Sequence, residues 1–240
     1  MTPRIIYEDK NFLAVDKPAG LLTHSTTSSK EETLVDWLKK RYPEVAKIGD
    51  DPKTRPGIVH RLDRDTSGIM LIARNQKYFE YLKNLFQTRA IKKTYRALVY
   101  GRVIPKKGSI KKEIRIKSGT TKRTVFKGRS ERAAVTEYKV LRHSALSLSN
   151  GSKEDFSWVE LQPLTGRTHQ IRVHLASIGH PVVGDKLYTS RKYKAVGQPY
   201  IGRQMLHAYS LEFSPAPGKR LKLAANLPAD MKVALRAVFE

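Results

Sequence analysis

The sequence contains no cysteine. This absence excludes disulfides and thiolate metal ligands, and it fits a reducing compartment. The sequence also lacks the glycine-rich phosphate loop, the Gly-x-Gly-x-x-Gly dinucleotide fingerprint and the Gly-x-Ser-x-Gly nucleophile elbow. His169 and His174 are five residues apart, a spacing that does not place two metal ligands on one helical face. We therefore expect neither a metal ion nor a cofactor.

Long apolar runs are also missing. No stretch approaches the roughly 20 apolar residues that a membrane-spanning helix needs. Met1 leads directly into Arg4-Ile5-Ile6-Tyr7, without the apolar core of a signal peptide. We expect a cytoplasmic protein that does not partner a membrane.

Acidic residues are scarce. The sequence contains 22 Asp and Glu and 46 Lys and Arg, which gives a formal net charge of +24. Such an excess destabilises the folded state by self-repulsion, and solubility alone needs less charge. The composition therefore predicts a polyanionic partner. RNA, DNA and an acidic membrane surface all meet this requirement on composition alone.

The sequence does contain a succession of short strand and helix patterns. Strands are expected at 5–7, 12–15, 68–73, 94–101, 135–141, 156–161, 206–213 and 220–224, and helices at 34–42, 75–89, 167–178 and from 228 onward. Thr33 is the expected N-cap of the first helix, and Asn150-Gly151 the turn between the fifth and sixth strands. No long linker or internal repeat interrupts the pattern. We predict an α+β fold, one domain over residues 1–240, with a long, mostly antiparallel mixed sheet flanked by helices and loops.

Residues 102–132, the basic segment, contain twelve Lys or Arg and two acids, Glu113 and Glu131. Strand-like Ile114 and Ile116 lie among these charges, so we expect ordered hairpins with one basic face. A solvated charged face is the alternative, but the length of the segment favours contact with phosphates. The residues predicted to contact phosphates are Lys111, Lys112, Lys122 and Arg123.

The segment from His60 to Gly68 concentrates two carboxylates and two guanidiniums within five residues, beside an expected buried strand. A neighbouring guanidinium favours the ionised form of a carboxylate, which then serves as a nucleophile or base without a cofactor. The alternative is a turn at Asp65-Thr66-Ser67-Gly68, with Arg61 and Asp63 paired on the surface. The residues alone leave both interpretations open.

The segment from Thr165 to His174 is expected to open a helix after Gly166. Free backbone N–H groups at a helix N-terminus, together with Arg167 and Arg172, would form an anion site. Ile171, Val173 and Leu175 are the expected core positions of this helix.

Six segments, in order along nearly the whole chain, resemble the RluA-type pseudouridine synthases, which modify large-subunit ribosomal RNA and transfer RNA. They are Lys17–Leu21; His60–Asp63 with Thr66–Gly68; Lys93–Val99; Thr165–His174; Gly179–Asp185 with Tyr188; and Leu206–Ala208. The resemblance implies an isomerase that flips a uridine out of the RNA and rejoins its base through carbon 5.

The resemblance also implies roles for individual residues. Asp63 would be the essential catalytic aspartate, and Arg172 would pair with it. Arg61 would fill the gap left by the flipped uridine. Tyr95 would lie against the uracil and assist proton removal at carbon 5. Arg167 would contact phosphate. His60 and His169 belong to the same predicted RNA-binding set.

Several points stay open at this stage. Many relatives carry a small RNA-binding appendage ahead of the catalytic region, whereas here the pattern begins within the first twenty residues, so we expect no appendage. A module that binds RNA without turnover, and a nucleoside hydrolase or glycosylase, are the competing functions. We expect a monomer that acts on transfer or ribosomal RNA and not on DNA. Asp63 would attack the sugar, attack the base or remove a sugar proton.

Overall fold

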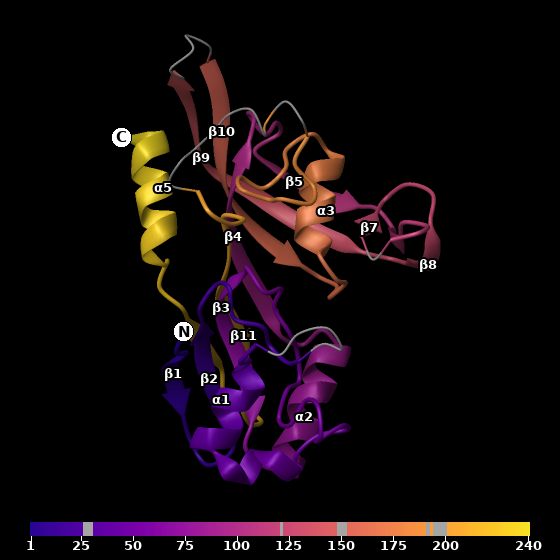
Figure 1. The fold of residues 1–240 in the computed structure, drawn as a ribbon, viewed down its shortest axis with the longest axis vertical. Coiled ribbons are helices and arrows are strands. Elements are labelled where there is room, and N and C mark those ends of the chain that lie inside the picture. The colour runs from indigo at the N-terminus through magenta and orange to yellow at the C-terminus, as the bar shows by residue number, and fades with distance from the viewer. Residues whose placement is uncertain (26–30, 121, 148–152, 191–192, 194–200) are drawn as a thin grey trace. The chain divides into compact units, whose positions relative to one another are not determined.

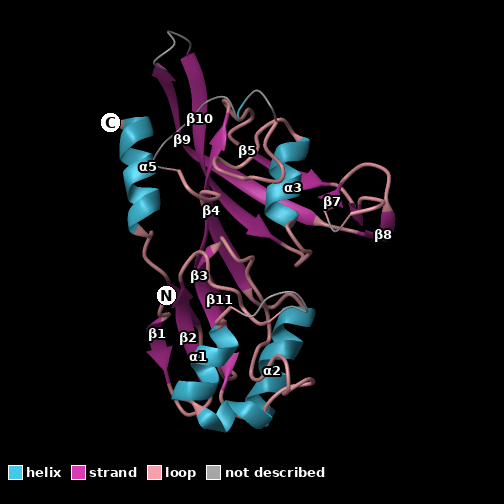
Figure 2. Ribbon diagram, viewed as in Figure 1, coloured by secondary structure: helices cyan, strands magenta, loops and turns pink. Residues whose placement is uncertain are grey.

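The computed structural model describes residues 1–25, 31–120, 122–147, 153–190, 193 and 201–240. Contacts divide the chain into two compact units. Unit 1 combines Met1–Lys93 with Ala208–Asn226, and unit 2 combines Thr94–His207 with Leu227–Glu240. The predicted turn at Asn150-Gly151 lies outside the described residues. Figure 1 and Figure 2 show the elements of each unit.

Unit 1 is built on a sheet with strand order β1-β2-β3-β11-β12. These strands are β1 (Arg4–Glu8), β2 (Phe12–Lys17), β3 (Ser67–Ala73), β11 (Leu206–Phe213, which begins in unit 2) and β12 (Leu221–Ala224). All seven residues of β3 are buried, as its continuous apolar run predicts. A Cβ on Gly68 would lie 2.2 Å from the carbonyl oxygen of Ala208, so only glycine allows β3 and β11 to approach this closely.

Two α-helices and a 3₁₀ turn complete unit 1: α1 (Leu34–Arg41), η1 (Pro43–Lys47) and α2 (Gln76–Gln87). Thr33 forms a capping box with Asp36 at the start of α1, which confirms the predicted cap. The side chain of Asn75 accepts a hydrogen bond from the N–H of Tyr78 and so caps α2. Phe79, one of three buried apolar residues of α2, lies on the predicted inner face.

The main sheet of unit 2 has the strand order β4-β10-β9-β5. These strands are β4 (Lys92–Tyr100), β5 (Lys107–Lys111), β9 (Val135–Ser147) and β10 (Lys153–Pro163), and all three pairings are antiparallel. A separate sheet, here the small sheet, has the order β7-β6-β8 and lies within the basic segment. It contains β6 (Ile114–Ile116), β7 (Arg123–Thr124) and β8 (Arg129–Arg132), in agreement with the predicted hairpins.

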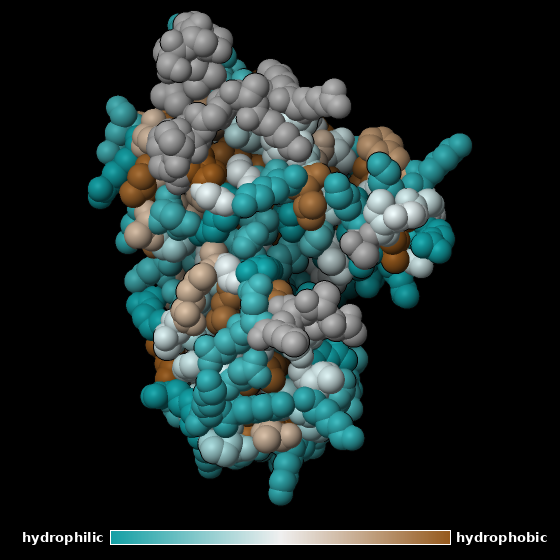
Figure 3. Space-filling model, viewed as in Figure 1, coloured by the Kyte–Doolittle hydropathy of each residue, from teal (hydrophilic) through white to brown (hydrophobic). Residues whose placement is uncertain are grey.

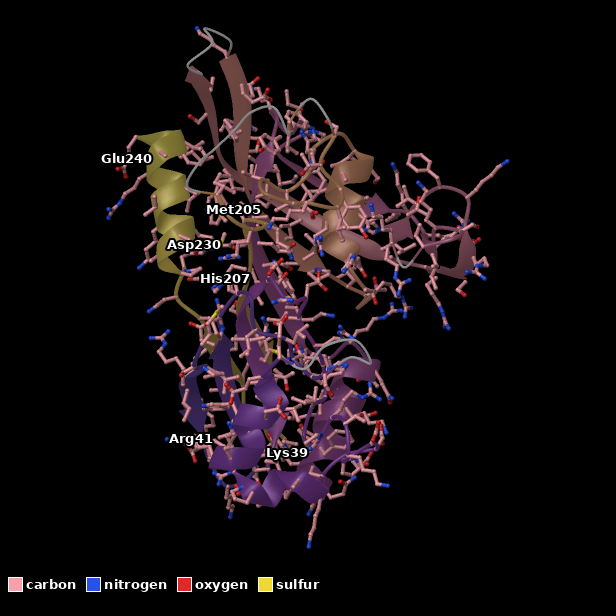
Figure 4. The ribbon with its side chains drawn as sticks, in the orientation of Figure 1. Lys39, Arg41, Met205, His207, Asp230 and Glu240 are labelled. Atoms are coloured by element: carbon pink, nitrogen blue, oxygen red, sulfur yellow. The ribbon has the colours of Figure 1, made fainter. Side chains whose placement is uncertain are left out.

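Two helices cover opposite faces of the main sheet of unit 2 (Figure 1): α3 (Gln170–Ser177) and α5 (Ala229–Phe239). Successive residues of a strand face opposite sides of a sheet, so each helix packs on a different set of β4 residues. Val99 belongs to the core under α3, and Leu98 belongs to the core under α5. Asp230, at the start of α5 (Figure 4), accepts two hydrogen bonds from Arg203, at 2.6 and 3.0 Å. Both faces of this sheet therefore contribute to the core.

The α+β class and the mostly antiparallel sheet agree with the sequence prediction. One helix boundary was wrong, because α3 begins at Gln170 and not after Gly166. His169 has φ 56°, in the left-handed region, so the residues before Gln170 cannot continue the helix. The single domain over residues 1–240 stays a prediction. Within the described parts of the chain, none of the helices is long and apolar enough to cross a membrane.

Candidate active site

The loop around Asp63, residues 60–66, lies in unit 1 and leads into β3. Asp63 is half-buried between buried Leu62 and exposed Arg64, and Arg61 is exposed. The backbone N–H of Thr66 donates to the carbonyl of Asp63 at 3.1 Å. The turn therefore spans Asp63 to Thr66, two residues earlier than the predicted turn at Asp65-Thr66-Ser67-Gly68, because Ser67 and Gly68 already belong to β3.

Lys17 holds this loop from the end of β2. Its side chain is completely buried. The ammonium donates to the carbonyls of Pro18, Leu21 and Arg64 at 2.9, 2.8 and 3.0 Å. A buried ammonium is tolerated only when acceptors replace its water, and three carbonyls match its three N–H groups. Lys17 therefore fixes the carbonyl that follows Asp63.

Backbone contacts complete the support of the loop. The N–H of Gly20 also donates to the carbonyl of Arg64, at 2.9 Å. The hydroxyl of Thr23 donates to the carbonyl of Leu62 at 3.1 Å. The peptide groups on both sides of Asp63 are therefore held in place. Sequence reasoning used Lys17 only as part of a motif; its position directly before Pro18-Ala19-Gly20, at the end of an apolar strand, was the available signal for its burial.

His60 supports the strand that follows the loop. The N–H of Leu71 donates to Nε2 of His60 at 2.9 Å, and the imidazole stacks on Phe86 with ring centroids 4.4 Å apart. Burial and the charge of Lys93 lower the pKa of His60 to about 3, so the ring is neutral. The geometry gives His60 a supporting role, and its predicted contact with RNA stays a prediction.

Arg172 and Asp185 form a buried ion pair in unit 2. Nε and Nη2 of Arg172 donate to the two carboxylate oxygens at 2.6 and 3.0 Å. The two side chains are 5% and 0% exposed. Asp185 also accepts the backbone N–H groups of Leu187 and Tyr188 at 2.8 and 3.1 Å. This bidentate arrangement fixes the plane of the guanidinium. The predicted pairing of Arg172 with Asp63 stays a prediction.

The turn before α3 is organised by a buried side chain, that of Gln170. Its Oε1 accepts from the hydroxyl of Thr165 at 2.7 Å and from the N–H of Arg167 at 3.0 Å. Its amide nitrogen donates to Val135 and Thr136, both at 3.0 Å. The anion site predicted at this helix start is therefore altered, because the glutamine occupies an N–H group that a phosphate would have used. Arg167 is half-buried, and its Nε donates to the carbonyl of Ala133 at 3.2 Å.

Tyr95 and His169 are both half-buried residues of unit 2. Tyr95 lies on β4 opposite Leu161 and packs against the core under α3. Nδ1 of His169 is 2.8 Å from the hydroxyl of Tyr188. The ring of Tyr188 lies 5.1 Å from the guanidinium carbon of Arg172. Sequence reasoning did not include Asp185 and Tyr188 among the site residues, although the Gly184-Asp185 and Tyr188 motif pointed to them.

The basic segment contributes cations from several elements of unit 2. Lys111 and Lys122 are exposed, and Arg123 is half-buried. The ammonium of Lys112 donates to the carbonyl of Ser177 at the end of α3, at 2.9 Å, which is a favourable position for a cation. Long hydrophilic side chains project from the region of β7 and β8 (Figure 3).

Both acids of the basic segment pair with one arginine. Arg115 lies 2.7 Å from Glu113 and 2.6 Å from Glu131. The acids therefore neutralise a residue on β6 at the centre of the small sheet, and the net charge of the segment stays strongly positive. Among the described residues, no cluster of three or more His, Cys, Asp and Glu side chains is arranged to hold a metal.

The sequence of this chain is similar to those of known proteins. Residues 11–177 match the RNA pseudouridylate synthase family. An uncharacterized RNA pseudouridine synthase of Bacillus subtilis, YhcT, is 38% identical over 237 residues, covering 98% of this chain and 72% of the relative. Ribosomal large subunit pseudouridine synthase D of Borreliella burgdorferi is 36% identical over 225 residues, covering 93% of this chain and 65% of the relative.

A solved structure shares the fold. Human RNA pseudouridylate synthase domain containing 4 superposes with a TM-score of 0.74 and 28% identity, covering 98% of this chain and 92% of that one. The chain thus spans most of the length of this structure, and about two thirds to three quarters of the length of the two bacterial relatives.

Proposed function

We propose that this chain, which belongs to the RNA pseudouridylate synthase family, forms pseudouridine in transfer RNA or large-subunit ribosomal RNA with Asp63 as the catalytic carboxylate. Members of this family are isomerases that act on uridine in RNA. The observation that carries this assignment is the loop of unit 1, where Asp63 is half-buried and the peptide groups on both sides of it are held by hydrogen bonds. Preorganised groups of this kind are what a reacting carboxylate needs.

The reaction rearranges one nucleotide without an added reactant. The bond between N1 of uracil and C1′ of ribose breaks, the base rotates, and a bond forms between C5 and C1′. C5 then loses its proton and N1 gains one, so that atoms and charge balance. The uridine must first leave the base stack. The ionised Asp63 serves in any of three routes: attack on the sugar, attack on the base, or removal of a sugar proton.

Neighbouring residues are assigned the remaining roles. Arg61 is exposed beside Asp63, as a side chain that replaces the flipped uridine in the stack must be. Tyr95 lies against the uracil and assists proton removal from C5. Arg172, held by Asp185, orients Asp63. Arg167 contacts phosphate. In this proposal a packed pocket excludes the water that would otherwise release free uracil.

The basic segment binds the RNA backbone. Its cations include Lys111, Lys112, Lys122 and Arg123, with His169 nearby in unit 2 through its contact with Tyr188. Displacement of counterions from phosphates provides much of the free energy of such binding. The proposal includes no metal and no cofactor. It describes a cytoplasmic monomer that does not act on DNA.

Tritium release from RNA labelled at C5 of uridine tests the proposal directly. Wild-type protein is compared with Asp63→Asn and with Asp65→Asn, a control that makes the same change at a half-buried aspartate two residues away. We expect release by the wild type and the control, and none by Asp63→Asn, with RNA affinity within a few fold in all three. Transfer and ribosomal RNA are assayed separately.

Other outcomes identify the competing functions. Tight binding without release by the wild type would indicate an RNA-binding module. Free uracil in the wild-type reaction would indicate a glycosylase. Full activity of Asp63→Asn would remove the catalytic assignment.

A further inference from the structure

Tyr188 contacts three separate features of unit 2 through different atoms. Its ring lies 5.1 Å from the guanidinium carbon of Arg172. Its backbone N–H donates to Asp185 at 3.1 Å. Its hydroxyl accepts the backbone N–H of Arg123 at 3.1 Å and lies 2.8 Å from Nδ1 of His169. One side chain therefore touches the Arg172–Asp185 pair, the residue before α3 and the basic segment.

The hydroxyl of Tyr188 satisfies both of its polar neighbours at once. The amide of Arg123 donates to the phenolic oxygen, which leaves the O–H proton for Nδ1 of His169. In the neutral tautomer that accepts this proton, Nε2 of His169 carries the hydrogen. Each of these two contacts then uses one proton.

Each neighbour of the Tyr188 hydroxyl needs such a partner. Arg123 lies on β7, the edge strand of the small sheet, where an outward amide would otherwise lack a partner within the sheet. His169 has φ 56°, a conformation that is uncommon outside glycine and that surrounding contacts must stabilise. The Tyr188 hydroxyl therefore holds the edge of the basic segment against the start of the helix that carries Arg172.

We propose that Tyr188 is a positioning residue that couples RNA binding by the basic segment to the orientation of Arg172. Its hydroxyl sets the position of the small sheet for binding of the phosphate backbone, and its ring supports the guanidinium of Arg172 from one face. This inference rests on the proposed function, because it assigns parts of the same site. It predicts that the two halves of one side chain control different kinetic constants.

The test separates the hydroxyl from the ring. Tyr188→Phe keeps the ring and removes one hydrogen-bonding group, so KM and the Kd for RNA should rise about fivefold while kcat stays within twofold. Tyr188→Leu also removes the ring, and kcat should then fall at least tenfold. Tyr42→Phe is the matched control, because it removes a tyrosine hydroxyl that donates to Glu8 at 2.9 Å in unit 1. It should change neither constant.

A double-mutant cycle distinguishes coupling from a general structural effect. Lys122→Ala/Arg123→Ala removes two cations of the basic segment but keeps the backbone N–H of Arg123. If the Tyr188 hydroxyl acts by positioning this segment, Tyr188→Phe should raise the Kd for RNA in that background by a smaller factor than in the wild type. The two factors should differ at least twofold.

Three results would overturn the inference: an unchanged KM in Tyr188→Phe, an unchanged kcat in Tyr188→Leu, or full independence of the two changes in the cycle. Because Kd is measured in binding assays without turnover, failure of this coupling is distinguishable from absence of synthase activity. Thermal unfolding of each variant verifies that the protein compared is folded.

Discussion

The loop around Asp63 in unit 1 and the α3 region in unit 2 are both held rigidly, but by different kinds of contact. One buried cation, Lys17, holds three backbone carbonyls at the first site. At the second site side chains bind one another and the backbone, chiefly Arg172 with Asp185 and Gln170 with its four neighbours. A loop without regular hydrogen bonding needs donors from elsewhere in the protein for its carbonyls. A helix pairs most of its own backbone groups, so contacts between side chains orient the functional residues that it carries.

Breaking the ion pair of unit 2 should have the largest effect on stability. Asp185→Ala would leave the guanidinium of Arg172 buried without its bidentate partner and would remove the acceptor of two backbone N–H groups. We expect the free energy of unfolding to fall by about 4 kcal/mol, measured by urea denaturation. Arg172→Met/Asp185→Leu should recover part of this loss, because neither charge is then buried. A loss below about 1 kcal/mol in Asp185→Ala would contradict the importance given to this pair.

Removing the buried ammonium of Lys17 in unit 1 should cost somewhat less stability but should affect catalysis selectively. Lys17→Met would keep the approximate volume of the side chain but would remove the ammonium donor from the carbonyls of Pro18, Leu21 and Arg64, of which Arg64 keeps the N–H of Gly20. We therefore expect a loss of about 3 kcal/mol in unfolding free energy. The Asp63 loop would lose its fixed position, so kcat should fall at least tenfold while RNA affinity stays within threefold. Lys77→Met, at an exposed lysine of the same unit, is the control. Equal losses of kcat and RNA affinity would argue that Lys17 supports the whole unit and not this loop.

Removing charge from the basic segment should have a smaller free-energy effect than either change above. Neutralising Lys111, Lys112, Lys122 and Arg123 together should lower RNA affinity by roughly 10- to 100-fold and flatten its dependence on salt concentration, because fewer counterions are released. The matched control neutralises four exposed lysines of unit 1, Lys10, Lys47, Lys53 and Lys77. We expect the control to change the slope of log Kd against log salt far less. Equal slopes for the two variants would mean that the basic segment is an ordinary solvated face.

Sequence patterns were sufficient for most elements of the fold. The continuous apolar run of β3, the Thr33 cap of α1 and the inner face of α2 are local signals, and each appears in the structure as predicted. The start of α3 was not predictable in this way. The hydrogen bonds of Gln170 join it to Val135 and Thr136, which are 35 and 34 positions away, and no local pattern signals the left-handed backbone of His169.

In the candidate site, too, some features were predictable from the sequence and others were not. The motifs of the sequence pointed to Asp63, Tyr95, Arg172 and Arg61, because these residue types at these spacings resemble a known family. They did not reveal that His60 accepts a hydrogen bond from β3, or that Tyr188 joins the basic segment to Arg172. Side-chain identity indicates which chemistry is available, but hydrogen-bond partners distant in the chain determine which residues support it.

The sequence by itself determined the class of the protein: its charge predicted a polyanionic partner, its motifs identified the family, and its periodicity indicated most of the α+β elements. Only the tertiary structure decided how the site residues are held. Lys17 and Arg64 are 47 residues apart, and Arg123 and Tyr188 are 65 apart. Contacts over such separations exist only after the chain has folded, because the entropy lost in closing these loops is offset by burial elsewhere in the protein.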